Sequence, residues 1–238
     1  PLVGTLEYDA RIPVLGVSAD EGARLRSMLA AGPVTMDLYA GGPQGTGENV
    51  VARERPGPCD EVVGGHYDSV PQSYGASDNA SGVATVLEIA RAEALQDIPG
   101  NQCFVLFGAE ELGLYGSTSF VSQLSAEDRA AIRAMLNFDM TGVGEVWWLI
   151  GTPSLVARAR DAVARGLGIE ATPAELPENT SSDHASFINT GIPAVMFHRW
   201  SDPYLHTPVD RIERVDGASV AQAAAMGLAL LRDLAAGP

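Results

Sequence analysis

The sequence predicts an α/β fold with a mixed, mostly parallel central sheet and helices on both faces of that sheet. Segments with apolar residues at helical spacing alternate along the chain with short apolar segments, an alternation typical of parallel sheets. The short segments are apolar at nearly every position, as expected of strands covered on both faces; they are residues 60–65, 103–108, 134–139 and 193–198. We therefore expect three layers, α/β/α.

Three further strands are predicted outside these four segments. Residues 34–39 and 49–53 are expected to form strands, joined as a hairpin across the glycine-rich loop 41–47. Residues 145–150 predict another strand, whose two adjacent tryptophans we expect to lie in the core, with the wall of a pocket as the alternative. The sheet should therefore extend beyond its four buried strands.

Helix starts are marked by capping residues. Ser125 followed by Asp128 approximates a capping box. Thr152 comes directly before Pro153, a residue that favours the first turn of a helix. Asp216 precedes a long alanine-rich segment, which we expect to form the last helix and to cover the sheet.

Composition limits the classes of partner. The chain has 238 residues, of which 46% are hydrophobic, enough for the core of one α/β domain. Its formal net charge of −15 argues against nucleic acid or an anionic membrane as the main partner. No apolar run reaches about 18 residues, and no signal peptide is visible. Because the sequence begins with proline, we interpret it as a processed or trimmed product.

Acidic residues or histidines follow each of the four buried strands. Singly, each has an ordinary explanation, such as a structural histidine, a solvated turn or a helix cap. Taken together, these separate explanations would require four independent coincidences at the carboxyl edge of one sheet, which is where ligands bind in α/β folds. The residues are His66, Asp68 and Asp78 after the first strand, Glu110 and Glu111 after the second, Asp139 at the third and His206 after the fourth. Asp183 and His184 precede the fourth strand.

A metal site explains the same residues together. Carboxylates that converge in one cleft raise one another's pKa unless cations compensate their charge. The carboxylates expected to converge here are those of Asp78, Glu110, Glu111 and Asp139. Two divalent ions would compensate their charge and remove the penalty. Histidine and carboxylate ligands suit zinc, and a shared carboxylate suits a two-metal hydrolase.

The candidate site residues lie in five short motifs: His66-Tyr67-Asp68-Ser69, Asp78-Asn79-Ala80-Ser81-Gly82, Ala109-Glu110-Glu111-Leu112-Gly113, Asn137-Phe138-Asp139 and His206-Thr207-Pro208-x-Asp210. In these motifs, their order and their rough spacing, the chain resembles the co-catalytic dizinc aminopeptidases, which include the leucine aminopeptidases of Vibrio and Streptomyces type and aminopeptidase Y. The likeness covers roughly residues 34–238 and implies a zinc-exopeptidase-like fold.

The resemblance implies a complete set of metal ligands. His66 and Asp139 would bind one zinc ion, and Glu111 and His206 the other, with Asp78 bridging the two. The resemblance also implies a non-proline cis peptide bond after the bridging residue, between Asp78 and Asn79. We therefore expect two Zn²⁺ per chain.

The resemblance also implies catalytic and supporting roles. Glu110 would be the general base, and Asp68 would hold the ring of His66. Asp183, His184 and Tyr204 would support ligands or contact substrate. Some relatives carry a tyrosine beside the last histidine that helps to hold the developing oxyanion. Here that position is Leu205, and because neighbouring side chains alternate in direction, Tyr204 need not substitute; the oxyanion partner stays open.

Residues 1–33 are expected to lie outside the peptidase domain, which we assign to residues 34–238. A strand at residues 12–14 followed by a helix to about Ala31 resembles the end of a protease-associated domain. An ordinary N-terminal helix of the main domain explains the segment equally well.

The two cysteines are too few for a disulfide scaffold or a cysteine-only zinc site. Cys59 lies seven residues before His66, and Cys103 seven before Glu110, so neighbouring strands would bring the sulfurs to similar depth. A disulfide and two free thiols are both open, and we expect two buried free thiols.

The sequence thus predicts a secreted or periplasmic metallo-aminopeptidase that hydrolyses peptides with a free N-terminus through a water bridging two zinc ions. Two alternatives stay open. A glutaminyl cyclase would use one metal and lack the full ligand set, and a receptor-like homologue, as in the transferrin receptor, would have lost ligands.

Overall fold

The computed structural model describes residues 18–35, 46–53, 55–96, 98–178 and 180–237. The chain divides into two compact units, Pro1–Thr46 with Pro177–Thr180, and Gly47–Leu176 with Ser181–Pro238. The first unit contains helix α1 (Ala19–Ala31), which begins where Ser18 accepts a hydrogen bond from the backbone N–H of Glu21. The second unit contains all the strands of the described residues.

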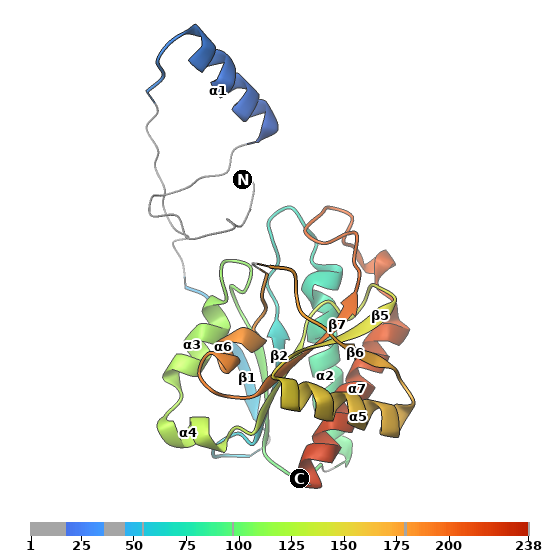
Figure 1. The fold of residues 1–238 in the computed structure, drawn as a ribbon. Helices are drawn as coiled ribbons and strands as arrows, with labels where there is room; N and C mark the ends of the chain where they lie inside the picture. The colour runs from blue at the N-terminus through green and yellow to red at the C-terminus, as the bar shows by residue number, and fades with distance from the viewer. Residues whose placement is uncertain (1–17, 36–45, 54, 97, 179, 238) are drawn as a thin grey trace. The chain divides into compact units, whose positions relative to one another are not determined.

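A seven-stranded mixed sheet forms the centre of the second unit (Figure 1). Its order is β1-β3-β2-β4-β7-β5-β6. The four central strands are parallel, β1 and β5 run antiparallel to their neighbours β3 and β7, and β6 is parallel to β5. The bounds are β1 (Val50–Arg53), β2 (Glu61–His66), β3 (Gln102–Phe107), β4 (Ala134–Phe138), β5 (Val146–Gly151), β6 (Ala171–Pro173) and β7 (Ala194–Trp200). The four segments predicted as buried strands are the four central parallel strands.

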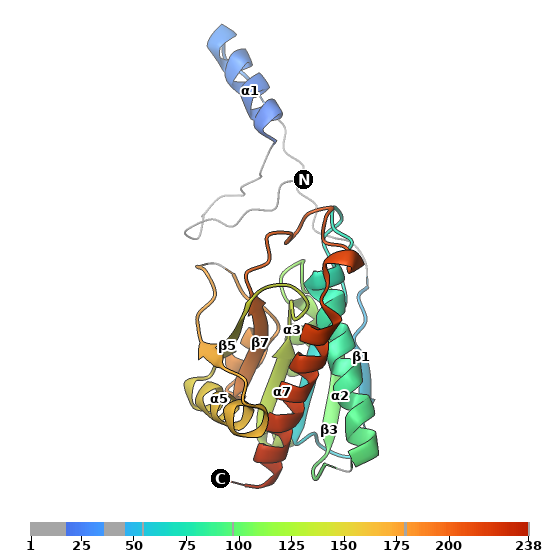
Figure 2. The ribbon, with the colours of Figure 1, turned by 90° about the vertical axis from the view of Figure 1, so that its right-hand side faces the viewer.

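Helices cover both faces of the sheet, which confirms the predicted layers (Figure 2). One face packs against α2 (Gly82–Gln96), α5 (Pro153–Leu167) and α7 (Gly217–Ala235). The other packs against α3 (Tyr115–Gln123) and α6 (His184–Ile188), and the short α4 (Ala126–Ala131) follows α3. None of the helices in the described part of the chain is both long and apolar enough to cross a bilayer.

Two aromatic groups mark the two layers of the core. Phe138 and Phe197 stack at 4.9 Å between ring centroids on the α2/α7 face. On the α3/α6 face, Phe107 meets Phe120 at 5.9 Å and Phe187 at 6.0 Å. Phe107 and Phe138 are the last residues of β3 and β4, so both clusters include strand ends that the polar residues follow.

The predicted helix starts are present, with one difference in detail. Ser125 accepts a hydrogen bond from the backbone N–H of Asp128, and Asp216 accepts one from that of Ala218. Thr152 precedes α5, but its hydroxyl does not cap the helix. That hydroxyl instead accepts the backbone N–H of Ala194, at 3.1 Å, and so ties the start of α5 to β7.

Some predicted elements fall where the structure describes little. Residues 36–39 of the strand expected over 34–39 and residues 41–45 of the 41–47 loop lie outside the described residues, as does the strand at 12–14. Strand β1 agrees with the strand predicted over 49–53. Trp147 is buried in the core as expected, whereas its neighbour Trp148 is partly exposed and stacks on Trp200 at 4.3 Å.

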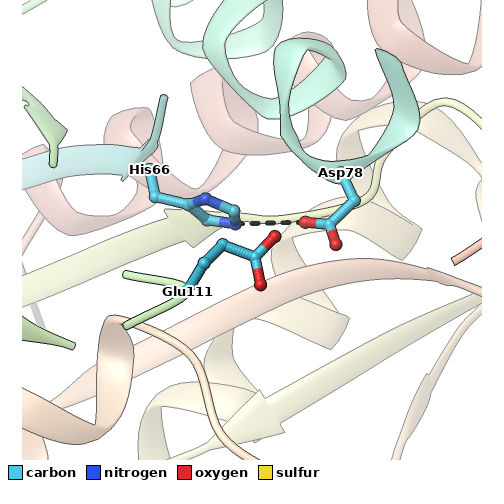
Figure 3. Close-up of side chains that lie close together, drawn as sticks. All are labelled: His66, Asp78 and Glu111. Carbon is cyan, nitrogen blue, oxygen red and sulfur yellow. Dashed lines mark ion pairs between the residues drawn. The ribbon is translucent and has the colours of Figure 1, made fainter. Parts of the chain in front are cut away.

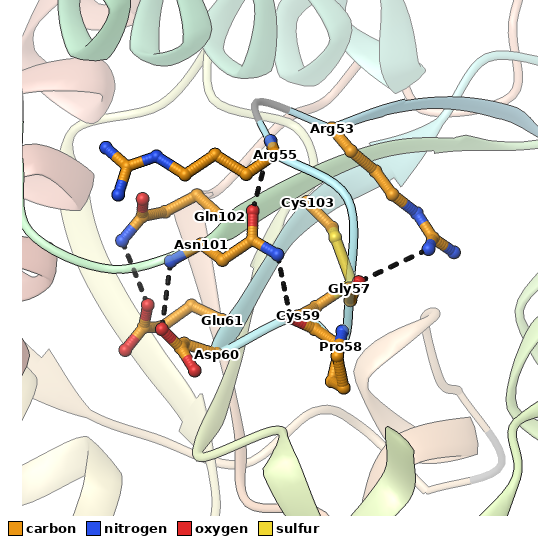
Figure 4. The surroundings of a disulfide bond; sticks show 10 residues. All are labelled: Arg53, Arg55, Gly57, Pro58, Cys59, Asp60, Glu61, Asn101, Gln102 and Cys103. Atoms are coloured by element: carbon orange, nitrogen blue, oxygen red, sulfur yellow. Dashed lines mark hydrogen bonds between the residues drawn. A yellow bond between two sulfur atoms is a disulfide. The ribbon is translucent and has the colours of Figure 1, made fainter.

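The expectation of two free thiols is wrong, because Cys59 and Cys103 form a disulfide (Figure 4). Strands β2 and β3 are parallel neighbours, and Val62 pairs with Cys103. The segment before β2 is held against the start of β3 by Asn101, whose side chain donates to the Pro58 carbonyl at 2.8 Å. The two Cα atoms are therefore 5.6 Å apart, within the usual range for a disulfide. The bond lies at the amino end of both strands, opposite to the edge where His66 ends β2.

Candidate metal centre

The segments after the carboxyl ends of the central strands bring the five predicted ligands together. His66 is the last residue of β2, and Asp139 directly follows β4. Glu111 lies in the turn between β3 and α3, and His206 in the segment between β7 and α7. Asp78 belongs to a wide helical turn, η1 (Ala76–Ser81), that leads into α2.

Asp78 lies between the two histidines. Its Oδ1 is 3.2 Å from His66 Nε2, and its Oδ2 is 3.1 Å from His206 Nε2. Figure 3 shows the Asp78 carboxylate facing the His66 ring, with the Glu111 carboxylate beside both. Each oxygen of a single carboxylate is thus directed to a different imidazole.

A second carboxylate completes each side of the cluster. Asp139 Oδ1 lies 3.4 Å from His66 Nε2, and Glu111 Oε2 lies 3.0 Å from His206 Nε2. The other Glu111 oxygen, Oε1, is buried and accepts no hydrogen bond from the described residues. The cluster therefore has two halves, each with one imidazole nitrogen and one carboxylate, joined by Asp78.

The backbone around Asp78 is shaped for this position. Asp78 and Asn79 have non-helical φ/ψ angles within η1, and the peptide bond between them is cis, as the family resemblance implied. Helix α2 can begin at Gly82 because this residue has no Cβ: a Cβ there would lie 2.2 Å from both Asn79 Oδ1 and the Phe138 carbonyl oxygen. The close approach brings the η1 segment against the end of β4, where Asp139 follows.

Asn79, a residue to which the sequence assigned no role, joins the segments that carry Asp78 and Asp139. Its side-chain Nδ2 donates to the Phe138 carbonyl at 2.9 Å, and its Oδ1 accepts the Met140 backbone N–H at 3.2 Å. These two bonds flank Asp139 on both sides. An asparagine directly after a candidate ligand was the only sequence signal for this contact.

Asp68 is placed differently from the expectation in one respect. Its carboxylate accepts the backbone N–H groups of Glu110 and Glu111, at 3.0 and 3.2 Å. The His66 Nδ1 atom lies 3.1 Å from the Asp68 backbone carbonyl and 3.7 Å from the Asp68 carboxylate. The carbonyl therefore makes the closer contact with the ring, while the carboxylate holds the turn that carries both glutamates.

His198 also lies next to the cluster and was not singled out from the sequence. His198, near the end of β7, is buried, and its Nδ1 lies 3.0 Å from the Asp139 carbonyl. Its position at the end of the fourth predicted strand was the available signal. Close by, Asn137 donates to the Ser182 hydroxyl at 2.7 Å, which fixes the segment before α6 to β4.

The electrostatics of the cluster reflect crowded carboxylates. Hydrogen bonds to Asp78 and Glu111 raise the pKa of His206 to about 10. Burial, helped by the charges of Asp139 and Asp183, raises the pKa of Glu110 to about 9, although His66 opposes the shift. In the metal-free chain, protons on these groups therefore compensate part of the negative charge that a bound cation would otherwise neutralise.

The predicted supporting residues lie around the cluster. Asp183 and His184 are buried at the start of α6, and burial raises the pKa of Asp183 to about 7 and lowers that of His184 to about 4. The ring of Tyr204 lies under Arg214, with 5.0 Å between the guanidinium carbon and the ring centroid. Leu205, beside His206, is 43% exposed and offers no hydrogen-bond donor on its side chain.

Comparison with known proteins places this arrangement in a family. The model of Peptidase family M28 matches residues 49–231. Aminopeptidase YwaD of Bacillus subtilis is 34% identical over 234 residues, an alignment that covers 89% of this chain and 49% of the relative. The probable lipoprotein aminopeptidase LpqL of Mycobacterium tuberculosis is 33% identical, with 92% of this chain and 53% of the relative covered. The chain thus spans about half the length of these curated relatives.

A solved structure gives the same result for the fold. The zinc aminopeptidase BSAP from Bacillus subtilis superposes with a TM-score of 0.69 at 31% sequence identity. The match covers 78% of this chain and 49% of that one. The likeness agrees with the three-layer α/β/α architecture described above.

Proposed function

This chain belongs to peptidase family M28, and on that basis we propose that it is a zinc-dependent aminopeptidase that removes the first residue of peptides. The observation that carries the proposal is the position of Asp78, with one carboxylate oxygen directed to His66 and the other to His206. A bridging carboxylate between two histidine-containing halves is suited to two cations. The named activity of the relatives supports the reaction class.

The donor set fits zinc. Ligand atoms on a tetrahedral zinc ion with bonds of about 2.0–2.1 Å lie about 3.4 Å apart. The four nitrogen–oxygen separations of the cluster run from 3.0 to 3.4 Å. We propose that His66 and Asp139 hold one ion, that Glu111 and His206 hold the other, and that Asp78 serves both. Glu111 Oε1, which is buried and accepts no hydrogen bond within the described part of the chain, offers a further ligand atom.

The chemistry divides between the ions and Glu110. When bound, the zinc ions would polarise the carbonyl of the first peptide bond and lower the pKa of the attacking water. Glu110 would accept a proton from that water and then deliver it to the leaving amine. Its position supports this role, because carboxylate and imidazole atoms of Glu110, His66 and Asp139 lie within 4.8 Å of one another. Asp68 would hold the backbone of Glu110 in place.

Negative charge around the cluster supports recognition of a free N-terminus. Three of the proposed ligands, Asp78, Glu111 and Asp139, are carboxylates, and the sequence as a whole carries a net charge of −15. A cationic α-amine would be favoured in such a site, whereas an acetylated N-terminus would lose the attraction. We therefore propose peptides with a free N-terminus as substrates.

Two broader features complete the proposal. The disulfide between Cys59 and Cys103 supports a secreted or periplasmic location, because such bonds persist in oxidising compartments. We also propose that residues 34–238 form the peptidase domain and that residues 1–33 belong to a separate N-terminal segment.

Two measurements test this function. Protein purified without chelator should contain about two zinc ions per chain by elemental analysis, and a reproducible value near one would favour a glutaminyl cyclase.

A panel of aminoacyl-p-nitroanilides should be cleaved, and each N-acetylated counterpart should be cleaved far more slowly. Chelation should abolish the activity, and added Zn²⁺ or Co²⁺ should restore it. Equal rates on free and acetylated substrates would contradict an aminopeptidase, and no hydrolysis by the zinc-loaded protein would favour a receptor-like role.

A further inference from the structure

Asp210 is a buried carboxylate that touches the segment of the bridging ligand. It lies four residues after His206 and is 0% exposed. Its Oδ1 accepts the backbone N–H of Ser77 at 2.6 Å, and its Oδ2 accepts that of Asp78 at 3.2 Å. The Ser73 hydroxyl adds a weaker contact to Oδ2, at 3.4 Å. Two consecutive amides of η1 therefore converge on one side chain from a segment more than 130 residues away.

A carboxylate buried to this extent needs a compensating set of donors. Burying a charge is costly unless hydrogen bonds replace its water, and three donors do so here. The same hydrogen bonds stabilise η1, because burying a backbone N–H without an acceptor also costs free energy. Since the peptide of Asp78 is held at its N–H, the carboxylate of Asp78 starts from a fixed backbone position.

We propose that Asp210 is a positioning residue for the metal centre, setting the Asp78 carboxylate against His206. The two ligands are 3.1 Å apart, and Asp210 connects their segments through bonds to the backbone of one and a four-residue link to the other. The same device occurs once more in the site, where Asp68 accepts the two amides of Glu110 and Glu111. This inference rests on the proposed zinc site, but not on the identity of the substrate.

The substitution Asp210→Asn tests it with little change of shape. The amide oxygen can still accept one N–H, but the amide NH₂ then faces the other, a donor against a donor. In metal-stripped protein, we expect Zn²⁺ affinity, measured by competition with a fluorescent zinc chelator, to fall about 10–100-fold, the scale for residues that orient metal ligands. The visible spectrum of the Co²⁺-loaded variant should differ from that of the wild type. On a p-nitroanilide substrate, kcat should fall more than KM rises.

Asp60→Asn is the matched control. Asp60 also accepts a backbone N–H, that of Asn101 at 2.9 Å, but it lies at the amino edge of the sheet, before β2. The Asp60→Asn substitution should lower thermal stability without changing Zn²⁺ affinity or the Co²⁺ spectrum. If Asp210→Asn behaves in the same way, losing stability while keeping wild-type Zn²⁺ affinity, spectrum and kcat, Asp210 is not a positioning residue. Failure of the wild-type protein to bind Zn²⁺ would instead contradict the proposed function itself.

Discussion

Glu110 and Glu111 are adjacent in the chain but occupy different parts of the site. Glu111 Oε2 lies 3.0 Å from His206 Nε2 and groups with His66 and Asp78, whereas Glu110 groups with His66 and Asp139. The backbone N–H groups of both glutamates donate to Asp68, so the turn is held while the side chains diverge. This divergence allows the two residues to be separated by substitution.

Replacing Glu110 with glutamine should remove the general base and keep the metals. We expect Glu110→Gln to retain about two zinc ions and the wild-type fold, while kcat falls about 10²–10⁴-fold. KM should change much less, because the lost interaction acts in the transition state. Steady-state kinetics on a p-nitroanilide substrate and elemental analysis of the same sample check both points.

Glu111→Ala should have the opposite pattern. It removes one of the two carboxylates next to His206, so zinc content should fall toward one ion per chain when measured after dialysis against metal-free buffer. Asp128→Ala, at the start of the exposed helix α4, is a control that should not alter zinc content. If Glu110→Gln lost a metal while Glu111→Ala kept both, the two assignments would be exchanged.

The metal-free protein should lose stability as the pH rises above neutral. The pKa of His206 is raised from 6.5 to about 10, so the folded chain holds this proton more tightly than the unfolded chain. The associated stabilisation is complete below about pH 6.5 and is lost as the pH rises through about 10. Glu110, raised from 4.5 to about 9, acts in the same direction over a range that begins lower.

Bound zinc should weaken this pH dependence. Metal ligands must be deprotonated, so zinc affinity rises with pH and compensates the loss. We therefore expect the Tm of chelator-treated protein to fall between pH 6.5 and 10, and that of zinc-saturated protein to fall much less. In chelator, His206→Gln should show a shallower fall than the wild type. Parallel pH profiles with and without zinc would argue against the proposed ligands.

Tyr204 is expected not to stabilise the oxyanion. Its ring is engaged by Arg214, and it is separated from His206 by Leu205. Tyr204→Phe keeps the ring and removes only the hydroxyl, so kcat should fall by much less than the 10²–10³-fold that loss of an oxyanion donor causes. A drop of that size in steady-state kinetics would instead assign the oxyanion contact to Tyr204.

The disulfide should stabilise the fold without tuning the metal centre. The double substitution Cys59→Ser and Cys103→Ser should lower the free energy of unfolding in urea by about 2–4 kcal/mol, the usual range for a native disulfide. The zinc affinity of the folded protein should be unchanged, since the bond lies at the amino edge of the sheet and the ligands at the carboxyl edge. A reduced zinc affinity in competition assays would show that the two edges are coupled.

The features that could be anticipated from the sequence belong to local patterns. The apolar segments became the four central strands, and the polar residues that follow them, such as His66 and Asp139, came together because parallel strands end at one edge. Contacts that depend on register or on backbone groups were not predictable in this way. The disulfide depends on how the chain turns before β2, and the bonds of Asn79 and Asp210 go to backbone groups about 60 and 130 residues away.

The disulfide also bears on how the site forms during folding. Glu111 lies 45 residues after His66, but only eight after Cys103, while His66 lies seven after Cys59. In an unfolded chain with the bond intact, the path between these two ligands shortens to about 15 residues. The entropic free-energy cost of bringing the two ligands together falls by about 1 kcal/mol as a result. The oxidised chain would therefore begin folding with two of its five proposed ligands already near each other. Zinc should then bring the ligands together more readily than in the reduced chain.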